Sequence, residues 1–342
     1  MPVESWKTQQ GDAAMFLEFY GFREQPFGVT PDPRFLYLSP AHREALASLY
    51  YGIESGRGFM ALIAKPGMGK TTLLFQLLQR FQSSARTAFV FQTQCTSREF
   101  MRFLLAEIGC EISPDADLVS IHKEFNQCLL QEAQAGRRFI VVVDEAQNCD
   151  PSVLETIRLL SDFETPRAKL LQIVLAGQPE LADKLAKPSL GQLRQRISVL
   201  SRLEPLPLAE VDQFIAYRLR IAGYSTGTLF TPGARKLITD LSSGIPRNIN
   251  NICFNALSIG CALRQKTIDV DVVREVATDF DLSRLVADHS QSHAQPMVGK
   301  TTPAAFMSKD MSKDEALLSP SDAVAYMKEI IDVLNKRKGL DN

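Results

Sequence analysis

The feature that most constrains the fold is a glycine-containing segment between an apolar run and a helical pattern. The apolar run covers residues 59–64, and the helical pattern covers 70–81. The segment between them reads Ala64-Lys65-Pro66-Gly67-Met68-Gly69-Lys70-Thr71-Thr72. Its glycines let backbone N–H groups turn inward, and the helix start adds the positive end of a dipole. We therefore predict a phosphate-binding loop between a buried strand and a helix.

Two side chains of this loop carry specific chemistry. We expect Lys70 to reach the β- and γ-phosphates of ATP and the Thr71 hydroxyl to bind Mg²⁺. Ala64 stands where the pattern usually has its first glycine, and a small residue at the strand end tolerates this departure. The residues expected to contact the nucleotide from this segment are Lys65, Pro66, Gly67, Met68, Gly69, Lys70, Thr71 and Thr72.

A second signal is a pair of adjacent carboxylates after an apolar run. Residues 141–143 are all valine, and Asp144 and Glu145 follow directly. Burying such a pair is costly unless a cation or hydrogen bonds compensate the charge. We expect Asp144 to hold Mg²⁺ and Glu145 to activate the attacking water as a general base. An adjacent Asp-Glu pair with one strand inserted after Lys70 indicates an ATPase, rather than a kinase or a GTPase; a surface turn is the alternative.

The chain alternates apolar runs of strand length with helical patterns up to about residue 206. Continuous apolar runs are typical of strands buried on both faces, and this alternation predicts a parallel sheet covered by helices. The expected strands are 59–64, 87–92, 139–144, 171–177 and 197–203. From residue 208 only helical spacing follows, at 209–222, 232–242, 246–264 and 270–278. The predicted fold class is α/β: a parallel five-stranded sheet sandwiched by helices and followed by a small all-helical lid domain.

Composition and pattern suggest five segments. They are a flexible leader (1–15), the nucleotide-binding α/β domain (16–206), the helical lid (207–283), a polar linker (284–318) and a C-terminal amphipathic helix (319–342). The leader has no apolar core like that of a signal peptide, and no apolar run approaches the roughly 20 residues of a membrane span. We expect a cytoplasmic protein, with peripheral attachment at the inner membrane left open.

Charge and cysteine content limit the partners only weakly. The net charge of −1 gives no overall reason to expect nucleic acid or an anionic membrane as the main partner, although a local basic groove stays open. The six cysteines form no CxxC pair, and no histidine lies at zinc-ligand spacing from one. We expect free thiols that act as small hydrophobes in a reducing compartment.

Gln178 and a pair of arginines have roles that the residues alone leave open. Gln178 follows the apolar run 171–177, where it would orient the attacking water or simply begin a helix. Either Arg194 or Arg196 would reach the γ-phosphate of a neighbouring subunit as an arginine finger. The alternative for both arginines is a solvated helical face or a local ion pair.

Arg247 lies in the first turn of a predicted helix, after Gly244-Ile245-Pro246. A cation at a helix N-terminus opposes the helix dipole, so its presence needs another reason. Because a phosphate-binding loop is predicted elsewhere in the chain, we expect Arg247 to contact the nucleotide; a helix-capping role is the alternative.

Together these motifs resemble the general secretion pathway protein A (ExeA-like) family of AAA+ ATPases over roughly residues 16–282. The resemblance implies an AAA+ fold, ATP hydrolysis with Mg²⁺, and assembly into a ring or partial ring. It implies sensor roles for Gln178 and Arg247, favours the arginine-finger interpretation, and suggests that residues 19–35 pack around the adenine. The segments that carry it are Phe19–Phe22, Pro26-Phe27, Thr30–Pro33, Phe35–Tyr37, Gly67–Thr72, Asp144–Gln147, Leu159–Ser161, Gly177–Leu181, Leu193–Ile197 and Gly244–Arg247.

Two biological settings fit this resemblance. The first is a motor or switch that serves secretion or envelope assembly and binds a protein partner there. Secretion members often continue into a membrane span and a periplasmic region, whereas this sequence continues into a polar linker and one short helix, so a direct role in the cell wall is not predicted. The second is a DNA-associated AAA+ regulator of transposition (TniB- or TnsC-like), which predicts salt-sensitive DNA binding.

A switch that binds ATP but barely hydrolyses it is a third hypothesis, which the intact Glu145 disfavours.

Overall fold

The computed structural model describes residues 16–278, except 29, 111, 114, 166–167 and 226. The predicted leader 1–15, the linker 284–318 and the C-terminal helix 319–342 lie outside the described residues, as does the end of the predicted lid. Within the described residues, no helix combines the length and the apolar character needed to cross a membrane.

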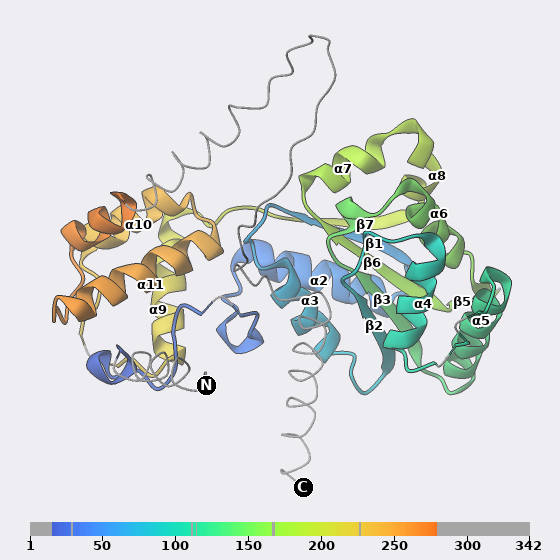
Figure 1. The fold of residues 1–342 in the computed structure, drawn as a ribbon, viewed down its shortest axis with the longest axis horizontal. Helices are drawn as coiled ribbons and strands as arrows, with labels where there is room; N and C mark the ends of the chain where they lie inside the picture. The colour runs from blue at the N-terminus through green and yellow to red at the C-terminus, as the bar shows by residue number, and fades with distance from the viewer. Residues whose placement is uncertain are drawn as a thin grey trace, which may run out of the picture. The chain divides into compact units, whose positions relative to one another are not determined.

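A five-stranded parallel sheet forms the centre of the α/β part (Figure 1). Its strand order is β2-β3-β6-β1-β7. The strands are β1 (Phe59–Ala64), β2 (Ala85–Val90), β3 (Arg138–Val143), β6 (Leu171–Gly177) and β7 (Ile197–Leu203). Every neighbouring pair is parallel. The predicted fold class is confirmed, and β2 begins two residues earlier than expected.

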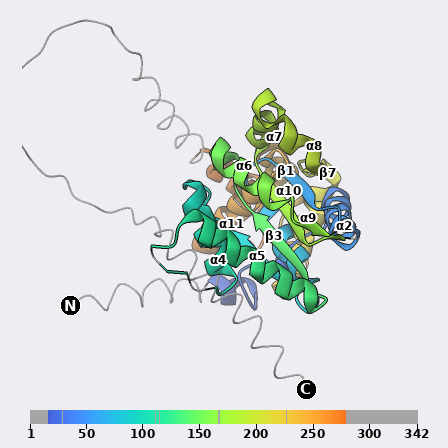
Figure 2. The same cartoon turned by 90° about the vertical axis from the view of Figure 1, so that its right-hand side faces the viewer.

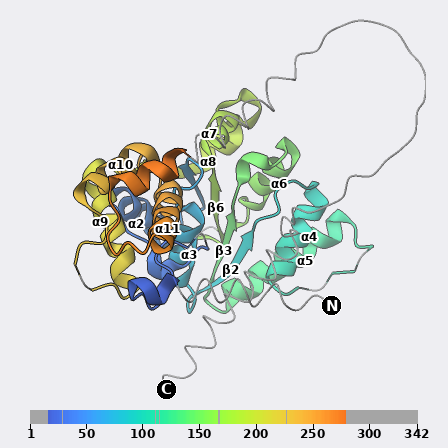
Figure 3. The same ribbon diagram turned by 60° about the vertical axis from the view of Figure 1, so that its left-hand side comes forward.

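Helices cover both faces of the sheet because its strands are apolar on both sides. On β3, Val141 and Val143 belong to one buried cluster, whereas Ile140 and Val142 belong to the other. The first cluster includes residues of α4 (Ser97–Glu107), α5 (Leu118–Gln134) and α6 (Pro151–Leu160), which Figure 2 brings to the front. The second includes residues of α2 (Pro40–Glu54) and α3 (Lys70–Gln79), which lie apart from α4 and α5 in Figure 3.

Several short elements were not predicted. The segment between β6 and β7 begins with α7 (Pro179–Ala186), where the sequence predicts a short helix at 179–184. It continues with the 3₁₀ turn η3 (Pro188–Leu190) and α8 (Gly191–Arg196), which were not predicted. Strands β4 (Glu164–Thr165) and β5 (Ala168–Lys169) form an antiparallel hairpin. Two further 3₁₀ turns are η1 (Pro33–Phe35) and η2 (Ala146–Asn148). Elements of two to six residues are too short to show a helical or strand period in the sequence.

A helical part follows the sheet and takes in the N-terminal aromatic residues. It consists of α9 (Leu208–Ile221), α10 (Pro232–Ser242), α11 (Pro246–Ala262) and a helical segment at 270–278. The N-terminal residues buried in its hydrophobic cluster are Phe16, Tyr20, Phe22, Phe27 and Phe35. The sequence boundary at 206/207 assigns these residues to the α/β part, but their side chains pack with the helices.

Arg218 of α9 holds the N-terminal segment in place. Its side chain is buried, and it donates to the carbonyl oxygens of Pro26 at 2.6 Å and of Phe35 at 3.3 Å. Burial of the guanidinium is costly unless its donors are satisfied, and these backbone acceptors satisfy them. The segment that lines one side of the pocket described below is therefore fixed to the helical part.

Candidate nucleotide site

A pocket lies where the glycine-containing loop, the N-terminal segment and the helical part meet. Its empty volume, which includes the open solvent at its mouth, is about 1090 Å³. Both the α/β part and the helices contribute to its lining. The predicted site residues in that lining are Pro66, Gly67, Met68, Gly69, Lys70, Thr71, Thr72, Glu145, Gln178 and Arg247.

The loop between β1 and α3 has the geometry of a phosphate cradle. Gly67 and Gly69 have φ angles of +78° and +86°, a region that glycine adopts without steric cost. Gly69 is the N-cap of α3, so the first N–H groups of this helix have no acceptor within it, and Lys70, Thr71 and Thr72 line the pocket. Lys70, the first residue of α3, is only 5% exposed. This buried ammonium group at a helix N-terminus needs anionic partners, as bound phosphates provide.

His42 of α2 supports this loop from behind. Its Nε2 lies 3.0 Å from the Met68 carbonyl oxygen, and its Nδ1 lies 2.7 Å from the Ser39 hydroxyl. A neutral ring that donates from Nε2 and accepts at Nδ1 satisfies both contacts. Burial lowers the pKa of His42, and the Met68 carbonyl only partly offsets it, so the neutral ring is favoured.

Asp144 is buried directly beside Thr71. The Thr71 hydroxyl donates to Oδ2 of Asp144 at 2.7 Å, and the Glu145 backbone N–H donates to Oδ1 at 2.9 Å. Burial raises the pKa of Asp144 despite these hydrogen bonds. A hydroxyl and a carboxylate are the hard oxygen ligands that Mg²⁺ prefers, and the buried carboxylate charge calls for a cation. These residues therefore fit the predicted metal ion.

Glu145 is held in place by amide donors. Gln147 donates to Oε2 at 2.5 Å, Gln178 donates to the same oxygen at 3.1 Å, and Lys70 Nζ lies 3.7 Å from Oε1. Burial raises the pKa of Glu145, but the two amides and the Lys70 charge outweigh it, so the net pKa is lowered. The pKa values of the two neighbouring carboxyl groups are thus displaced in opposite directions. Glu145 remains an ionised acceptor near neutral pH.

The backbone at Glu145 is in the left-handed region, with φ of +50°. Few non-glycine residues adopt this conformation, and it is costly unless surrounding contacts hold it. Here the Thr93 hydroxyl donates to the Glu145 carbonyl oxygen at 3.2 Å. The turn directs the Glu145 side chain toward the pocket lining and leaves Asp144 buried beneath it.

Arg247 reaches the pocket from the helical part. Its backbone N–H donates to the Gly67 carbonyl oxygen at 3.1 Å. A Cβ atom at Gly67 would lie 2.7 Å from the Cβ atom of Arg247, so this close approach requires glycine. Its side chain lines the pocket, and among the described residues its guanidinium has no ion-pair partner.

Four predicted residues are absent from the pocket lining: Asp144, which is buried beneath Glu145, and Lys65, Arg194 and Arg196. Lys65 is exposed and Arg194 is an exposed residue of α8. Arg196 forms an ion pair with Asp162 and donates to the Ser161 hydroxyl at 3.0 Å. The predicted alternatives to an arginine finger were a solvated helical face and a local ion pair. The structure shows the local ion pair for Arg196. Arg194 has no ion pair with the described residues and is free for contact with another molecule.

Sequence reasoning missed His42, Thr93 and Gln147 as contributors to the site. His42 and Thr93 lie outside the motifs, and their contacts arise only when α2 and the end of β2 meet the loop and the turn at Glu145. Gln147 belongs to the motif Asp144–Gln147, but its contact with the Glu145 carboxylate was not predicted. The predicted adenine segment 19–35 is divided. Its residues Gly28, Thr30, Pro31, Asp32 and Phe35 line the pocket, whereas Phe19, Tyr20 and Phe22 pack with the helices.

Comparisons with known proteins agree with this fold. A family profile described as an AAA domain matches residues 53–185. General secretion pathway protein A of Aeromonas hydrophila is 42% identical over 243 residues, which is 71% of this chain and 44% of the relative. An uncharacterized HTH-type transcriptional regulator of Methanocaldococcus jannaschii is 28% identical over 167 residues, 48% of this chain and 40% of the relative. The chain thus spans less than half the length of either relative.

Solved structures show the same architecture at low sequence identity. The ORC2 protein of Aeropyrum pernix superposes with a TM-score of 0.59 at 18% identity, covering 75% of this chain and 71% of its own. Cdc6p of Pyrobaculum aerophilum gives a TM-score of 0.56 at 15% identity, covering 71% and 67%. At these identities the likeness establishes the fold alone.

Proposed function

From the premise that this chain is an AAA+ protein resembling general secretion pathway protein A, we propose that it binds and hydrolyses ATP-Mg²⁺ to drive assembly or remodelling in a secretion or envelope-associated system. The observation that carries the hydrolytic part is the arrangement of Thr71, Asp144 and Glu145. A buried carboxylate paired with the loop hydroxyl lies next to an ionised carboxylate that lines the pocket. A protein that only bound nucleotide would have no need of the second group.

Each residue of the site has one role in this proposal. Lys70 and the loop N–H groups bind the β- and γ-phosphates, and Thr71 and Asp144 hold Mg²⁺, which neutralises phosphate charge when bound. Glu145 accepts the proton of the attacking water, and Gln178 orients that water beside it. Arg247 binds phosphate from the helical side, so the α/β and helical parts both respond to the nucleotide.

Arg194 completes the site of a neighbouring subunit in a ring or partial-ring homo-oligomer. This proposal is supported by the difference between the two arginines of α8. Arg196 forms an ion pair with Asp162, whereas Arg194 is exposed and forms no ion pair with any described residue. An arginine finger stabilises charge that develops on the transferred phosphoryl group, and it needs a guanidinium that is not neutralised within its own subunit.

The client and the cellular place follow from the relative alone. A protein named general secretion pathway protein A is 42% identical over 71% of this chain, so we propose a protein partner in secretion or envelope assembly. We propose a cytoplasmic location, with contact to the inner membrane through that partner. A DNA-associated role is the competing proposal, supported by the second relative, which is named as an HTH-type transcriptional regulator.

The test is ATP turnover by the purified full chain, measured over a series of protein concentrations with and without double-stranded DNA. We expect turnover per subunit to rise with concentration, because Arg194 acts in trans. Lys70→Ala removes the buried ammonium group and should abolish nucleotide binding and turnover. Lys236→Ala, an exposed lysine of α10, is the matched control and should leave both unchanged.

The outcomes separate the proposals. Stimulation by DNA would favour the DNA-associated role over the secretion role. Turnover that persists in Lys70→Ala would contradict the assignment of the site. A specific rate independent of concentration would contradict completion by a neighbouring subunit.

A further inference from the structure

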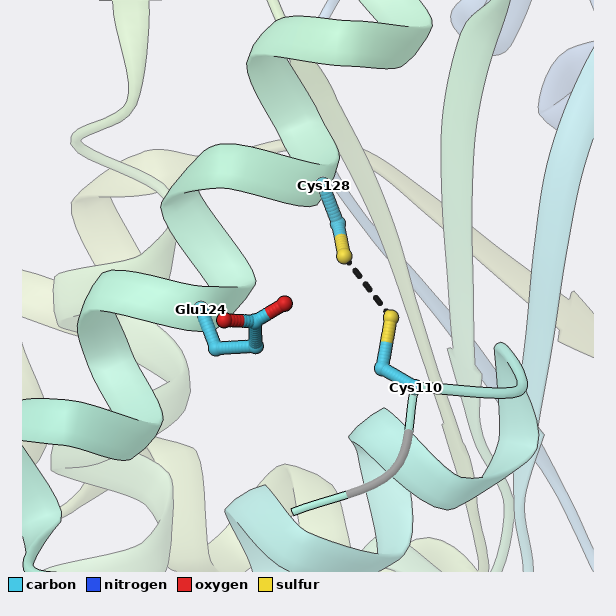
Figure 4. Close-up of side chains that lie close together, drawn as sticks. All are labelled: Cys110, Glu124 and Cys128. Atoms are coloured by element: carbon cyan, nitrogen blue, oxygen red, sulfur yellow. Dashed lines mark hydrogen bonds between the residues drawn. The ribbon is translucent and has the colours of Figure 1, made fainter.

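Two cysteines and a glutamate converge at the connection between α4 and α5 (Figure 4). Cys110 lies just after α4, whereas Glu124 and Cys128 lie one helical turn apart on α5. The two sulfur atoms are 2.8 Å apart, and the ligand atoms of all three side chains lie within 4.8 Å of one another. We call these three residues the thiol cluster.

Local structure holds the thiol cluster in this arrangement. Ile121, Phe125 and Leu129 of α5 are buried in the core, which leaves Glu124 and Cys128 at its half-buried border. Gly109 has a φ of +72° and ends α4, and the Cys110 backbone N–H donates to the Leu105 carbonyl oxygen at 2.9 Å. Because hydrogen bonds and core packing fix both segments, the convergence is a property of the fold.

The electrostatic surroundings of the thiol cluster favour a cation. The Glu124 carboxylate and the two sulfur atoms, all potential anionic ligands, lie within 4.8 Å of one another. Arg86 of β2 donates to the Ile108 carbonyl oxygen, two residues before Cys110. A divalent cation deprotonates the thiols that coordinate it.

We propose that Cys110, Glu124 and Cys128 form a binding site for a borderline-soft divalent cation of the Zn²⁺ type. Two thiolates and one carboxylate are ligands that zinc accepts, and a water molecule completes the fourth position of a tetrahedron. The two positive charges of the ion, with the guanidinium of Arg86, balance the three negative charges of the ligands. No predicted or proposed role of the nucleotide site uses any of these residues.

The geometry requires a small adjustment. With zinc–sulfur bonds of about 2.3 Å, two thiolates of a tetrahedral site lie about 3.8 Å apart, so the sulfur atoms move apart by about 1 Å on binding. Rotation of two half-buried side chains supplies this movement. A disulfide is the competing chemistry, but it needs an external oxidant, whereas zinc binding needs none.

The thiol cluster lies at the edge of the sheet opposite the nucleotide site. Arg86 is the second residue of β2 and lies in register with Phe139, the second residue of β3. Asp144 and Glu145 follow the last residue of β3, and the strands are parallel. The ion therefore stabilises the connection between α4 and α5, and failure of this proposal would leave the proposed ATPase intact.

The experiment uses the full chain, reduced and freed of metal with a chelator, then titrated with Zn²⁺ and separately with Co²⁺. We expect one ion per chain, thiolate-to-cobalt charge-transfer absorption, and a rise in Tm when Zn²⁺ exceeds its Kd about 100-fold. Cys128→Ser should remove the absorption band, and Glu124→Gln should weaken Zn²⁺ binding at least about 10-fold. Cys261→Ser, a half-buried cysteine of the helical part, is the matched control and should bind as the wild type does.

Three results would overturn the proposal. The first is the absence of thiolate-to-cobalt absorption in the wild-type protein. This measurement uses no variant, so a misfolded variant cannot affect it. The second is Zn²⁺ affinity that is equal in the wild type and in Cys128→Ser. The third is a Cys110–Cys128 disulfide found by alkylation and mass spectrometry in protein purified without reductant, which would assign the pair to redox chemistry.

Discussion

At the carboxyl ends of the strands, the functional side chains come mainly from short motifs, and they pair with one another. Lys70 and Thr71 belong to one motif, and Asp144 and Glu145 belong to another. Thr71 donates a hydrogen bond to Asp144, and the Lys70 ammonium group lies 3.7 Å from the Glu145 carboxylate. Near the amino end of β2, by contrast, the thiol cluster gathers residues separated by up to 18 positions with no recognisable motif. The two edges of one sheet thus differ in how visible their sites are in the sequence.

The difference follows from the geometry of parallel sheets. At the carboxyl edge, each strand leads into a loop and then a helix N-terminus, so the loop residues and the first helical turn act together. At the amino edge, helices end and chains return to the sheet, and side chains meet there only through tertiary packing. We expect substitutions at the carboxyl edge to change turnover, and those at the amino edge to change stability and metal affinity.

The largest effect is expected from Arg194→Ala. If Arg194 acts as the arginine finger, turnover per subunit at saturating ATP falls by roughly 10³–10⁵-fold, while nucleotide affinity changes little. Arg196→Ala is the matched control, because it removes a hydrogen bond to Ser161 and a partly exposed ion pair with Asp162, the latter worth about 0–1 kcal/mol of stability. Steady-state ATPase rates and unfolding curves of both variants measure these effects. If Arg196→Ala lost turnover and Arg194→Ala did not, the assignment of the two arginines would be reversed.

Gln147→Ala tests how firmly the carboxyl edge depends on its internal hydrogen bonds. The variant removes the donor that lies 2.5 Å from Glu145, and a hydrogen bond to a charged group contributes about 1.5–3 kcal/mol. We expect turnover to fall roughly 10-fold to 100-fold. Because Gln147 lowers the pKa of Glu145, its removal should also move the acid limb of the pH–rate profile to higher pH.

The pH–rate profile separates a catalytic effect of Gln147 from a purely structural one. Gln131→Ala, at an exposed position of α5, serves as the control and should leave the acid limb in place. A loss of turnover in Gln147→Ala without a shift of the acid limb would mean that Gln147 supports the turn and not the ionisation of Glu145.

The smallest effect is expected from Arg86→Ala at the amino edge. The variant loses the hydrogen bond to the Ile108 carbonyl oxygen, so stability should fall by about 0.5–1.5 kcal/mol. Turnover should stay unchanged, and Zn²⁺ affinity should fall because a balancing charge is lost. Arg86→Lys keeps the charge and should retain more of the affinity. Urea unfolding measures the loss of stability, and ATPase assays measure turnover. Reduced turnover at unchanged stability would contradict the expectation that substitutions at the amino edge change stability and leave turnover unchanged.

The fold was predictable because its apolar runs are long and its helices carry end signals. The strands at 59–64, 171–177 and 197–203 have the predicted bounds. Strand β2 begins at Ala85 because its backbone pairing with β3 extends to that residue. The exposed side chain of Arg86 interrupts the apolar pattern there and hides the start of the strand. Pairing of this kind depends on a neighbouring strand, so local pattern could not reveal it.

The site was predictable where one motif holds both the backbone turn and the side chain. Lys70 and Asp144 satisfy this condition. The contact of His42 with Met68 does not, because it depends on where α2 meets the loop. Gln147 lies only two residues after Glu145, and its contact with that carboxylate depends on the left-handed turn at Glu145. The packing of Phe16 and Phe22 with the helical part was likewise invisible, since aromatic residues show that a segment is buried but not against which part.

The most direct test of the central claim is the fate of bound ATP in a single turnover. ATP-Mg²⁺ is bound to excess wild-type protein and to excess Glu145→Gln, and the bound nucleotide is identified over time. The wild type should convert bound ATP to ADP, whereas Glu145→Gln should bind ATP and retain it, with a rate roughly 10²–10⁴-fold lower. Equal rates in the two proteins would contradict the assignment of Glu145 as the general base of an ATPase.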